Sequence, residues 1–398
     1  MLIRKIQLTN FRSFKTKLLE FSPKTTVIIG PNASGKTNII ESIFLLSTGK
    51  SFHARVEEEM ISYSEEIARV KGAIVDKSDG ERSGTNLEVV LTRGEITIGR
   101  SPEKVEKVAR KKLLINGVSK RLIDFAGTFK TVLFGPWDMG LVTEAPSTRR
   151  KFLDTVLAQV DREYRRASMS YEKGLRQRNK ILWSLRENPS TPFSHSGRSQ
   201  LIFWDRLLIK NGDYISTKRM EFIEFVNSRE GLNDQIFSLE YDRSAISEAR
   251  LEQYADEEIA AASTLVGPHR DDFIFKVKGK SLPAGKAGQG VKDRELARYG
   301  SRGEQRMGIL WLKLSELAFI EQMSGEKPTL LLDDIFSELD HEHRNIVFEV
   351  VKGHRLGGAS GSESQQSHLH QGFGGQAIIT TADPHYIEGL EKVEKIKL

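Results

Sequence analysis

The hydrophobic pattern predicts short strands near both ends of the chain. Residues 1–10 alternate between apolar and polar side chains, which indicates an amphipathic strand. The runs at 27–29 and 329–332 are β-branched or apolar throughout, a pattern typical of buried parallel strands. We expect the last strand at 377–380. Strands of this kind next to helical segments predict an α/β fold.

The middle of the chain has a helical pattern. Leu157, Val160, Tyr164, Ala167 and Tyr171 follow one another at alternating spacings of three and four residues, as on one face of a helix. After the turn-rich stretch "ENPSTPFSHSG" (187–197), a second periodic stretch runs over 204–225. We therefore expect a helical hairpin. Each arm has only about thirty residues, so a long coiled coil is excluded.

A glycine-rich loop follows the strand at 27–29 and precedes helical apolar spacing at 38–46. Its sequence "GPNASGKT" matches the phosphate-binding pattern G-x-x-x-x-G-K-[ST]. Backbone N–H groups and the helix N-terminus would bind the phosphates of ATP, Lys36 would add a positive charge and Thr37 would offer a hydroxyl to Mg²⁺. The predicted nucleotide-binding residues are Gly30, Pro31, Asn32, Ala33, Ser34, Gly35, Lys36 and Thr37.

Two aspartates end the predicted strand at 329–332. Ligands bind at the carboxyl ends of strands in parallel sheets, so these carboxylates are candidates for the same site. We expect Asp333 to hold Mg²⁺ together with Thr37, and Asp334 to orient or deprotonate the attacking water. Lys36, Asp333 and Asp334 are therefore the candidate catalytic residues. In the alternative interpretation, the two aspartates only end a strand and cap a turn.

Nearly 300 residues separate the phosphate loop from these aspartates. A compact nucleotide-binding domain keeps its two motifs closer together, so we expect a head that is split in the sequence. Residues 1–148 would form its N-terminal half, 149–262 a helical arm or lobe, and 263–398 its C-terminal half.

The stretch "YGSRGEQR" resembles the signature motif of the ABC ATPase superfamily, with Ser301, Gly303 and Glu304 at the S-x-G-[EQ] positions. This resemblance implies that the serine and glycine contact the γ-phosphate held by the other subunit, so that ATP joins a homodimer. Ser301 and Glu304 also fit a capping box at the start of the next helix. The two roles are compatible.

The motifs together resemble the RecF family of bacterial recombination and DNA-repair proteins, which is related to the heads of SMC proteins. "LIRKIQLTNFRSF", "LFGPWDMGLVTEAPSTRRKFLD", "TLVGPHRDDF", "LLLDDIFSELD" and "IITTAD" occur in the family's order over nearly the whole chain. The resemblance implies an ABC-type, SMC-like head with Arg12 near the nucleotide, Asp138 in a Q-loop equivalent, Asp340 in a dimer-contacting loop and Thr381 as a γ-phosphate sensor.

Some of these positions have simpler interpretations. Arg12 could instead pair with a surface carboxylate. In "GPHRDD", the residues Arg270, Asp271 and Asp272 could form either a working site or a turn whose hydrogen bonds are satisfied, whereas His269 is expected to be structural.

The RecF resemblance also implies a function. It predicts an ATP-induced dimer clamp on DNA at gaps or junctions, with slow, DNA-stimulated ATP hydrolysis. The clamp would act in replication, recombination, repair and the SOS response, with RecR and RecO as partners and with the loading of RecA. The alternative is an ATP-binding dimerisation scaffold without significant hydrolysis. An ATPase-linked nuclease is disfavoured, because no acidic metal-binding region accompanies the motifs.

Positive charge is concentrated in one predicted helix. The whole chain has 60 Lys and Arg against 54 Asp and Glu, a net charge of +6, whereas 149–186 contains eleven basic and four acidic residues. These side chains could contact phosphates of single- or double-stranded DNA without sequence specificity. The alternative is an ordinary solvated helix face. The candidates are Arg162, Arg165, Arg166, Lys173, Arg176 and Lys180.

Composition excludes some other classes of protein. The absence of cysteine excludes disulfides and thiolate zinc sites. No apolar stretch is long enough for a membrane span, so we expect a cytoplasmic protein without a membrane partner.

Two segments depart from the family pattern. Residues 282–295 and 353–376 are low-complexity insertions, and Ala382 stands where RecF proteins more often carry a third threonine. We expect these departures to affect the signature and the switch, and we expect His354, His368 and His370 to be solvated loop residues.

Overall fold

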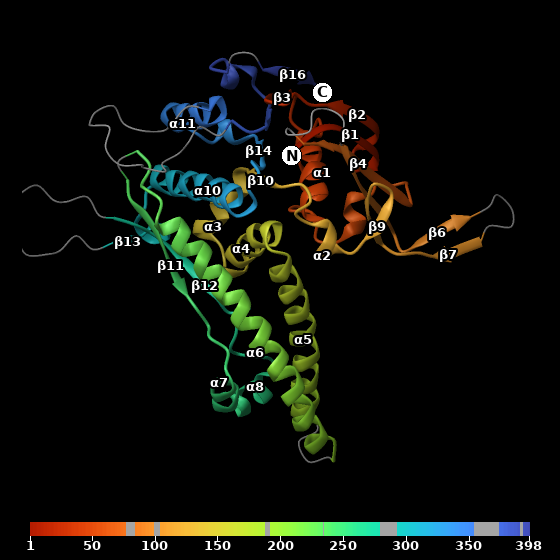
Figure 1. The fold of residues 1–398 in the computed structure, drawn as a ribbon, viewed down its shortest axis with the longest axis vertical. Coiled ribbons are helices and arrows are strands. Elements are labelled where there is room, and N and C mark those ends of the chain that lie inside the picture. Colours follow the sequence, from red (N-terminus) through yellow and green to blue (C-terminus); the bar gives the residue numbers. More distant parts are fainter. Residues whose placement is uncertain are drawn as a thin grey trace, which may run out of the picture. The chain divides into compact units, whose positions relative to one another are not determined.

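The computed structural model describes residues 1–76, 84–98, 104–187, 192–233, 235–278, 293–353, 374–390 and 393–398, without the side chains of 192–198. The described chain forms two compact units (Figure 1). The first contains 1–138 and 313–398, and the second contains 139–312. Both ends of the sequence therefore build one unit, as expected for a split head.

The first unit contains a five-stranded sheet in which every neighbouring pair is parallel. Its order is β10 (Thr131–Phe134), β14 (Thr329–Asp333), β15 (Ala377–Thr381), β3 (Thr25–Ile29) and β16 (Glu394–Lys397). Strands are confirmed at the predicted positions 27–29, 329–332 and 377–380. The expectation that the last strand lies at 377–380 is wrong, because β16 follows it. Its sequence, "EKIK", has a single apolar residue, which is too weak a pattern to predict a strand.

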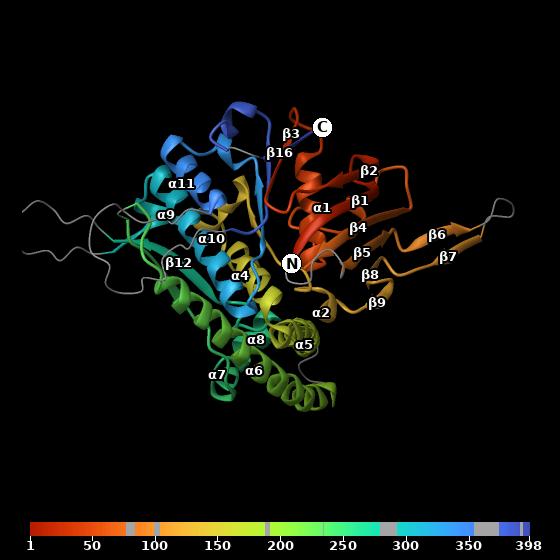
Figure 2. The same ribbon diagram turned by 45° about the horizontal axis from the view of Figure 1, so that its top comes forward.

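A six-stranded antiparallel sheet lies in the same unit. Its order is β2 (Phe14–Glu20), β1 (Leu2–Phe11), β4 (Ile67–Val75), β5 (Gly84–Thr92), β8 (Lys111–Ile115) and β9 (Val118–Lys120). Figure 2 shows a separate hairpin, β6 (Glu95–Ile98) and β7 (Lys104–Lys107), extending away from this sheet.

Helix α1 (Lys36–Thr48) is buried along most of its length. One hydrophobic cluster joins its Ile39 and Ile43 to Ile6 of β1 and to Leu331 and Ile378 of the parallel sheet. Apolar contacts on both sides fix the helix, and with it the loop that precedes it.

Gln376 links the two sheets of the first unit. Its buried Nε2 donates to the Ile3 carbonyl (2.7 Å) and the Ser22 carbonyl (2.8 Å). Its Oε1 accepts from the Ile3 N–H (2.9 Å) and the Thr329 hydroxyl (3.1 Å). Gln376 is therefore part of the core, although the sequence analysis placed it at the end of a low-complexity insertion. Residues 354–373 of that insertion lie outside the described residues, and so do His354, His368 and His370.

The second unit contains the predicted helical hairpin, α5 (Arg162–Glu187) and α6 (Pro192–Asn227) (Figure 1). It follows α3 (Gly140–Thr143) and α4 (Pro146–Val160). Helix α6 begins inside the stretch that was expected to be a turn, because proline is well tolerated in the first turn of a helix.

A three-stranded sheet joins this hairpin. Strand β11 (Phe237–Asp242) pairs with β12 (Asp272–Val277), which pairs with β13 (Arg294–Glu295). The remaining helices are α7 (Glu248–Gln253), α8 (Ala255–Ala261), α9 (Leu296–Tyr299) and the start of α10 (Arg302–Ser324). The predicted insertion 282–295 contributes Arg294 and Glu295 to β13, and its residues 282–292 lie outside the described residues.

Contacts group residues 263–312 with the hairpin, whereas the sequence analysis placed them in the C-terminal half of the head. The division into domains at 148/149 and 262/263 therefore stays a prediction. None of the helices in the described ranges has both the length and the hydropathy that crossing a membrane requires.

Candidate nucleotide and nucleic-acid sites

The loop between β3 and α1 has an unusual backbone. Ala33 (φ 65°) and Gly35 (φ 96°) adopt the left-handed conformation. A Cβ on Gly35 would lie 2.6 Å from the ring of Phe14, so only glycine fits there. The buried hydroxyl oxygen of Ser34 has no hydrogen-bond partner among the described residues. Successive backbone N–H groups in a turn with left-handed residues form an anion-binding concavity, so this geometry fits a phosphate-binding loop.

Lys36 is the first residue of α1, and its side chain is 7% exposed. Its ammonium group donates to the carbonyls of Gly30 (2.8 Å) and Pro31 (3.0 Å). The charge therefore lies within the loop, beside the N–H groups at the start of α1 that the helix itself leaves unpaired.

Asp333 connects the phosphate loop to two strands. Its Oδ2 accepts from the hydroxyl of Thr37 (2.8 Å), and its Oδ1 accepts from the hydroxyl of Thr380 (2.6 Å). Burial raises the pKa of Asp333, and the two hydroxyl hydrogen bonds oppose this shift. A buried carboxylate next to a hydroxyl is a donor set of hard oxygen atoms that fits Mg²⁺. Thr380 was not predicted as a site residue, although it lies in the quoted "IITTAD" motif.

Asp334 has a different environment from its neighbour. Its backbone is left-handed (φ 49°), and its N–H donates to the carbonyl (3.2 Å) and hydroxyl (3.1 Å) of Thr380. Its side chain caps no helix, and its buried Oδ1 has no hydrogen-bond partner within the described chain. The observed environment therefore does not match the alternative that Asp334 caps a turn with its carboxylate.

Arg12 forms a paired contact with the loop helix. Its Nε and Nη2 donate to the two carboxylate oxygens of Glu41 (2.8 and 2.7 Å), and its Nη1 donates to the Glu59 carbonyl (2.7 Å). Glu41 lies on α1 and is 1% exposed, so this carboxylate is buried and not on the surface. Whether Arg12 also contacts the nucleotide stays a prediction.

Asp138 belongs to a buried cluster of three charged groups. Its Oδ2 accepts from the Gly135 N–H (2.9 Å), and its Oδ1 lies 3.2 Å from the ammonium of Lys313, which lies 3.1 Å from Glu316. Burial raises the pKa of Asp138 and raises that of Glu316 to about 7. Burial alone would lower the pKa of Lys313, but the two carboxylates outweigh it and raise that pKa.

Lys313 and Glu316 were not predicted from the sequence. The signal that could have found them is a pair of opposite charges three residues apart in the otherwise apolar stretch "ILWLKLSELAFI". The predicted Q-loop role of Asp138 stays untested.

Thr381 and Asp340 both form local hydrogen bonds with the backbone that follows them. The hydroxyl of Thr381 donates to the Asp383 carbonyl (3.0 Å) and accepts from the Asp383 N–H (3.2 Å), and its own carbonyl accepts from the Gly30 N–H (3.3 Å). Asp340 caps α11 (His341–Lys352) by accepting from the N–H of His343 (2.9 Å). That backbone hydrogen bond is the main reason why the pKa of Asp340 is lowered.

The signature residues form the expected capping box at the start of α10. The Ser301 N–H donates to the Glu304 carboxylate (2.8 Å), and the Glu304 N–H donates to the Ser301 hydroxyl oxygen (3.2 Å). The first of these bonds contributes most to the lowered pKa of Glu304. A Cβ built on Gly303 would come no closer than 3.9 Å to another group, so the glycine faces open space. Contact with a partner subunit's nucleotide stays a prediction.

The six candidate DNA-binding residues share one face of α5. Each of them lies three, four or seven residues from another member, which places them in one stripe along the helix. The buried residues of α5, among them Tyr164, Ala167 and Tyr171, lie on the opposite face. We call the positions 162, 165, 166, 173, 176 and 180 the basic stripe.

The members of the basic stripe differ in their partners. Arg166 pairs with Glu163, and Arg176 pairs with Glu172. Arg165 is half-buried and donates to the Ala158 carbonyl (2.5 Å). Lys173 and Lys180 are exposed, and neither forms an ion pair with a residue that the structure describes.

The "GPHRDD" stretch forms a satisfied structural cluster. Asp271 is fully buried and accepts from Ser216 (3.0 Å), Arg219 (3.1 Å), Tyr241 (2.5 Å) and the Ser244 N–H (2.8 Å). His269 lies between Tyr171 and the Thr264 carbonyl, and burial lowers the pKa of this histidine to about 4. These contacts agree with the simpler interpretation of the stretch as a satisfied turn.

Comparison with known proteins agrees with this arrangement. The RecF/RecN/SMC N terminal domain family matches residues 2–357. The chain is 34% identical over 384 residues to the DNA replication and repair protein RecF of Roseiflexus castenholzii, covering 88% of this chain and 91% of that protein. The chain belongs to the RecF family. It is also 32% identical to RecF of Thermomicrobium roseum, over 86% of this chain and 89% of that protein.

Solved structures agree on the fold. A structure of the recombination mediator protein RecF with ATP, in the RecFOR pathway, superposes with a TM-score of 0.76 at 27% identity, covering all of this chain and 95% of that one. An Smc head domain derived from Pyrococcus yayanosii has a TM-score of 0.51 at 13% identity, over all of this chain and 95% of that one. This chain therefore has an SMC-like ABC ATPase head.

Proposed function

We propose that this chain is an ATP-dependent DNA clamp of recombinational repair and replication. Two copies would close on DNA at gaps or junctions when they bind ATP, and slow, DNA-stimulated hydrolysis would reopen them. The clamp would help RecO and RecR to load RecA in the cytoplasm and would support the SOS response. The observation that carries the proposal is the 2.8 Å bond from Thr37 to Asp333, which joins two nucleotide-binding motifs that lie 296 residues apart in the sequence.

The residues around this bond have separate roles. Gly30–Thr37 would hold the phosphates, and Lys36 would place its charge against them. Magnesium, when bound to Thr37 and Asp333, would neutralise phosphate charge and orient the γ-phosphate. Asp334 would orient the attacking water or accept its proton, because its Oδ1 is unpartnered within the described part of the protein.

The capping box supports a role for Ser301 in the dimer. Its hydroxyl oxygen accepts the Glu304 N–H, so its proton is still available to donate to a phosphate oxygen. The cap would fix the serine while the glycine two residues later leaves room for a partner's nucleotide.

A binding-only scaffold is the second candidate. It is favoured by Thr381, whose hydroxyl is engaged with Asp383 instead of being free to sense a phosphate. The names of the similar proteins, which place RecF in replication, repair and the RecFOR pathway, support the first candidate and the partners RecO and RecR.

The test is the mass of the protein in solution with Mg²⁺ and ATP, with ADP, and without nucleotide. We expect dimers only with ATP. Lys36→Met should abolish both ATP binding and dimers, whereas Ser301→Arg should keep ATP binding and lose dimers. Ser119→Arg, at an exposed serine on β9, is the matched control and should dimerise normally. A wild-type protein that binds ATP and stays monomeric would overturn the clamp.

A further inference from the structure

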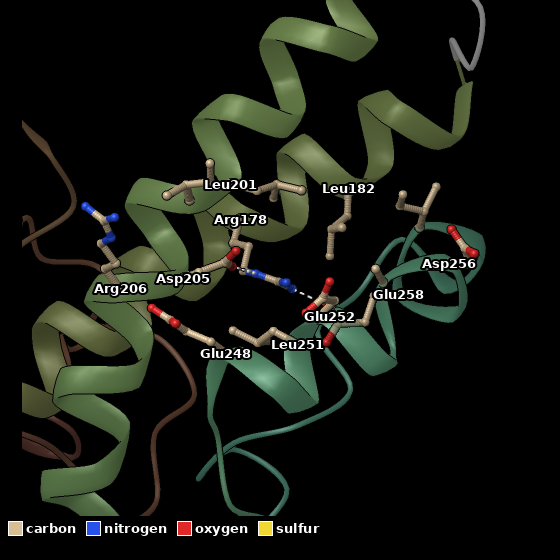
Figure 3. A pocket seen from close by; sticks show the side chains of 13 residues that line it. Arg178, Leu182, Leu201, Asp205, Arg206, Glu248, Leu251, Glu252, Asp256 and Glu258 are labelled. Carbon is tan, nitrogen blue, oxygen red and sulfur yellow. Dashed lines mark hydrogen bonds and ion pairs between the residues drawn. The ribbon is translucent and has the colours of Figure 1, made fainter.

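The second unit contains a pocket between the α5–α6 hairpin and the short helices α7 and α8 (Figure 3). Its volume is about 320 Å³. Apolar side chains from all four helices line it: Leu182, Leu201, Ile202, Leu251 and Ile259. Ile202 is 54% exposed, so the apolar surface continues from the pocket onto the outside of α6.

One buried arginine lines the pocket, and two carboxylates neutralise its charge. Arg178 donates to Asp205 (2.6 Å) and to the hydroxyl of Thr264 (2.9 Å), and it pairs with Glu258 (2.6 Å). Figure 3 shows its guanidinium between these two carboxylates. Because Arg178 already has two anionic partners, it offers no free positive charge to a ligand.

The rim of the pocket is acidic. Glu248, Glu252 and Asp256 are exposed, and none of them forms an ion pair with a described residue. Among the thirteen lining residues, Arg206 is the cation that remains to offset them. The pocket therefore combines an apolar wall with an excess of unpaired negative charge.

This surface is the opposite of the basic stripe in position and in charge. Arg178 and Leu182 belong to the buried face of α5, whereas the basic stripe runs along the other face. The rim would repel a nucleic-acid backbone and attract a cationic partner. A cavity of about 320 Å³ has room for only one or two large side chains.

We propose that this pocket docks a basic segment of a partner protein. The segment would insert one or two large apolar side chains between Leu182, Leu201 and Leu251, and its flanking lysines or arginines would face Glu248, Glu252 and Asp256. Such an anchor in a pocket with a charged rim is a common form of peptide recognition. The proposal does not rest on ATP binding or on the DNA clamp.

The test uses the full chain without nucleotide or DNA and a fluorescein-labelled amphipathic peptide of leucine and lysine at helical spacing. A scrambled peptide of the same composition is the control for shape. Fluorescence anisotropy should show tighter binding of the amphipathic peptide. Glu248→Lys with Glu252→Lys should weaken it roughly tenfold, and Ile202→Ser should weaken it about threefold.

Asp293→Lys with Glu224→Lys is the matched control, because both residues are exposed acids of the same unit that do not line the pocket. This pair should weaken binding less than about twofold. Equal weakening by both pairs, or equal binding of the scrambled peptide, would show unspecific attraction and overturn the proposal. All variants should keep the wild-type melting temperature and ATP binding, which separates this test from that of the clamp.

Discussion

Two adjacent aspartates at the candidate nucleotide site have different environments. Asp333 has both oxygens engaged by threonine hydroxyls, whereas Asp334 has a buried oxygen without a partner among the described residues and a left-handed backbone. Strain of this kind is retained where function requires it. The environments therefore favour Asp333 as the metal-holding residue and Asp334 as the residue that acts on water.

Asp334→Asn should separate hydrolysis from binding. Asparagine tolerates the left-handed backbone, so the fold should persist, but it cannot accept a proton. We expect phosphate release to fall by about 10²- to 10⁴-fold while ATP-dependent dimers persist. Phosphate release and solution mass would be measured together, with Lys36→Met as the reference without binding. Unchanged turnover in Asp334→Asn would remove Asp334 from the mechanism.

Local patterns predicted some residues of the site and not others. Lys36, Thr37 and Asp333 lie in motifs that can be recognised within a dozen residues of sequence. Thr380 contacts Asp333, which is 47 residues away, and the core residue Gln376 contacts Ile3, which is 373 residues away. No window of sequence shows such a pairing, because it exists only after the sheet has formed.

At the scale of elements, a buried charge cluster joins the turn at Pro136–Met139 to helix α10. Asp138, Lys313 and Glu316 place two carboxylates around one ammonium. Burial raises the pKa of Glu316 from its ordinary 4.5 to about 7, so the folded protein binds its proton more tightly than the unfolded chain does. The contribution of Glu316 to stability is thus largest below pH 4.5 and is lost as the pH rises to 7.

Glu316→Gln should remove this pH dependence. The free energy of unfolding of the wild type minus that of Glu316→Gln should fall between pH 4.5 and 7 and level off above pH 7. Urea denaturation of both proteins across this pH range would measure the difference. Glu321→Gln, on a half-exposed residue of the same helix, is the control for a glutamate outside the buried cluster. A flat difference for Glu316→Gln would show that its carboxyl titrates normally.

The basic stripe of α5 was predicted as a set of residues, but its partners were not. Arg166 and Arg176 are partly neutralised by glutamates of the same helix, whereas Lys173 and Lys180 have no ion pair within the described chain. The lysines should therefore contribute more to binding a phosphate backbone.

Lys173→Ala with Lys180→Ala should reduce the slope of log affinity against log salt for duplex DNA by about 1.8. The measurement is a salt titration of DNA binding with ATP present. Arg166→Ala with Arg176→Ala should have a smaller effect, and Lys112→Ala with Lys120→Ala, at exposed sites on β8 and β9, should have none. Equal slopes for all variants would show that the basic stripe does not bind DNA and is an ordinary solvated helix face.

At the scale of the molecule, the split head was predictable because its two motifs lie so far apart. The residue limits of the second unit were not predictable from the sequence. Strand β12 belongs to this unit because it pairs with β11, and the sequence does not show that pairing. Strand β16 was missed for a similar reason. It has little hydrophobic pattern of its own and is defined by its neighbour β3.

The position of β3 has a consequence for how the protein is made. Both of its neighbours in the sheet, β15 and β16, come from residues 377–397. A ribosome therefore synthesises the complete phosphate-binding motif about 350 residues before the strands that will hold it. At about 5–20 residues per second, this delay is on the order of half a minute. Until then, β3 lacks both of its sheet partners and the loop has no fixed shape. The capacity to bind ATP should thus arise only as synthesis approaches the last strands, so that nascent chains do not compete with finished molecules for nucleotide.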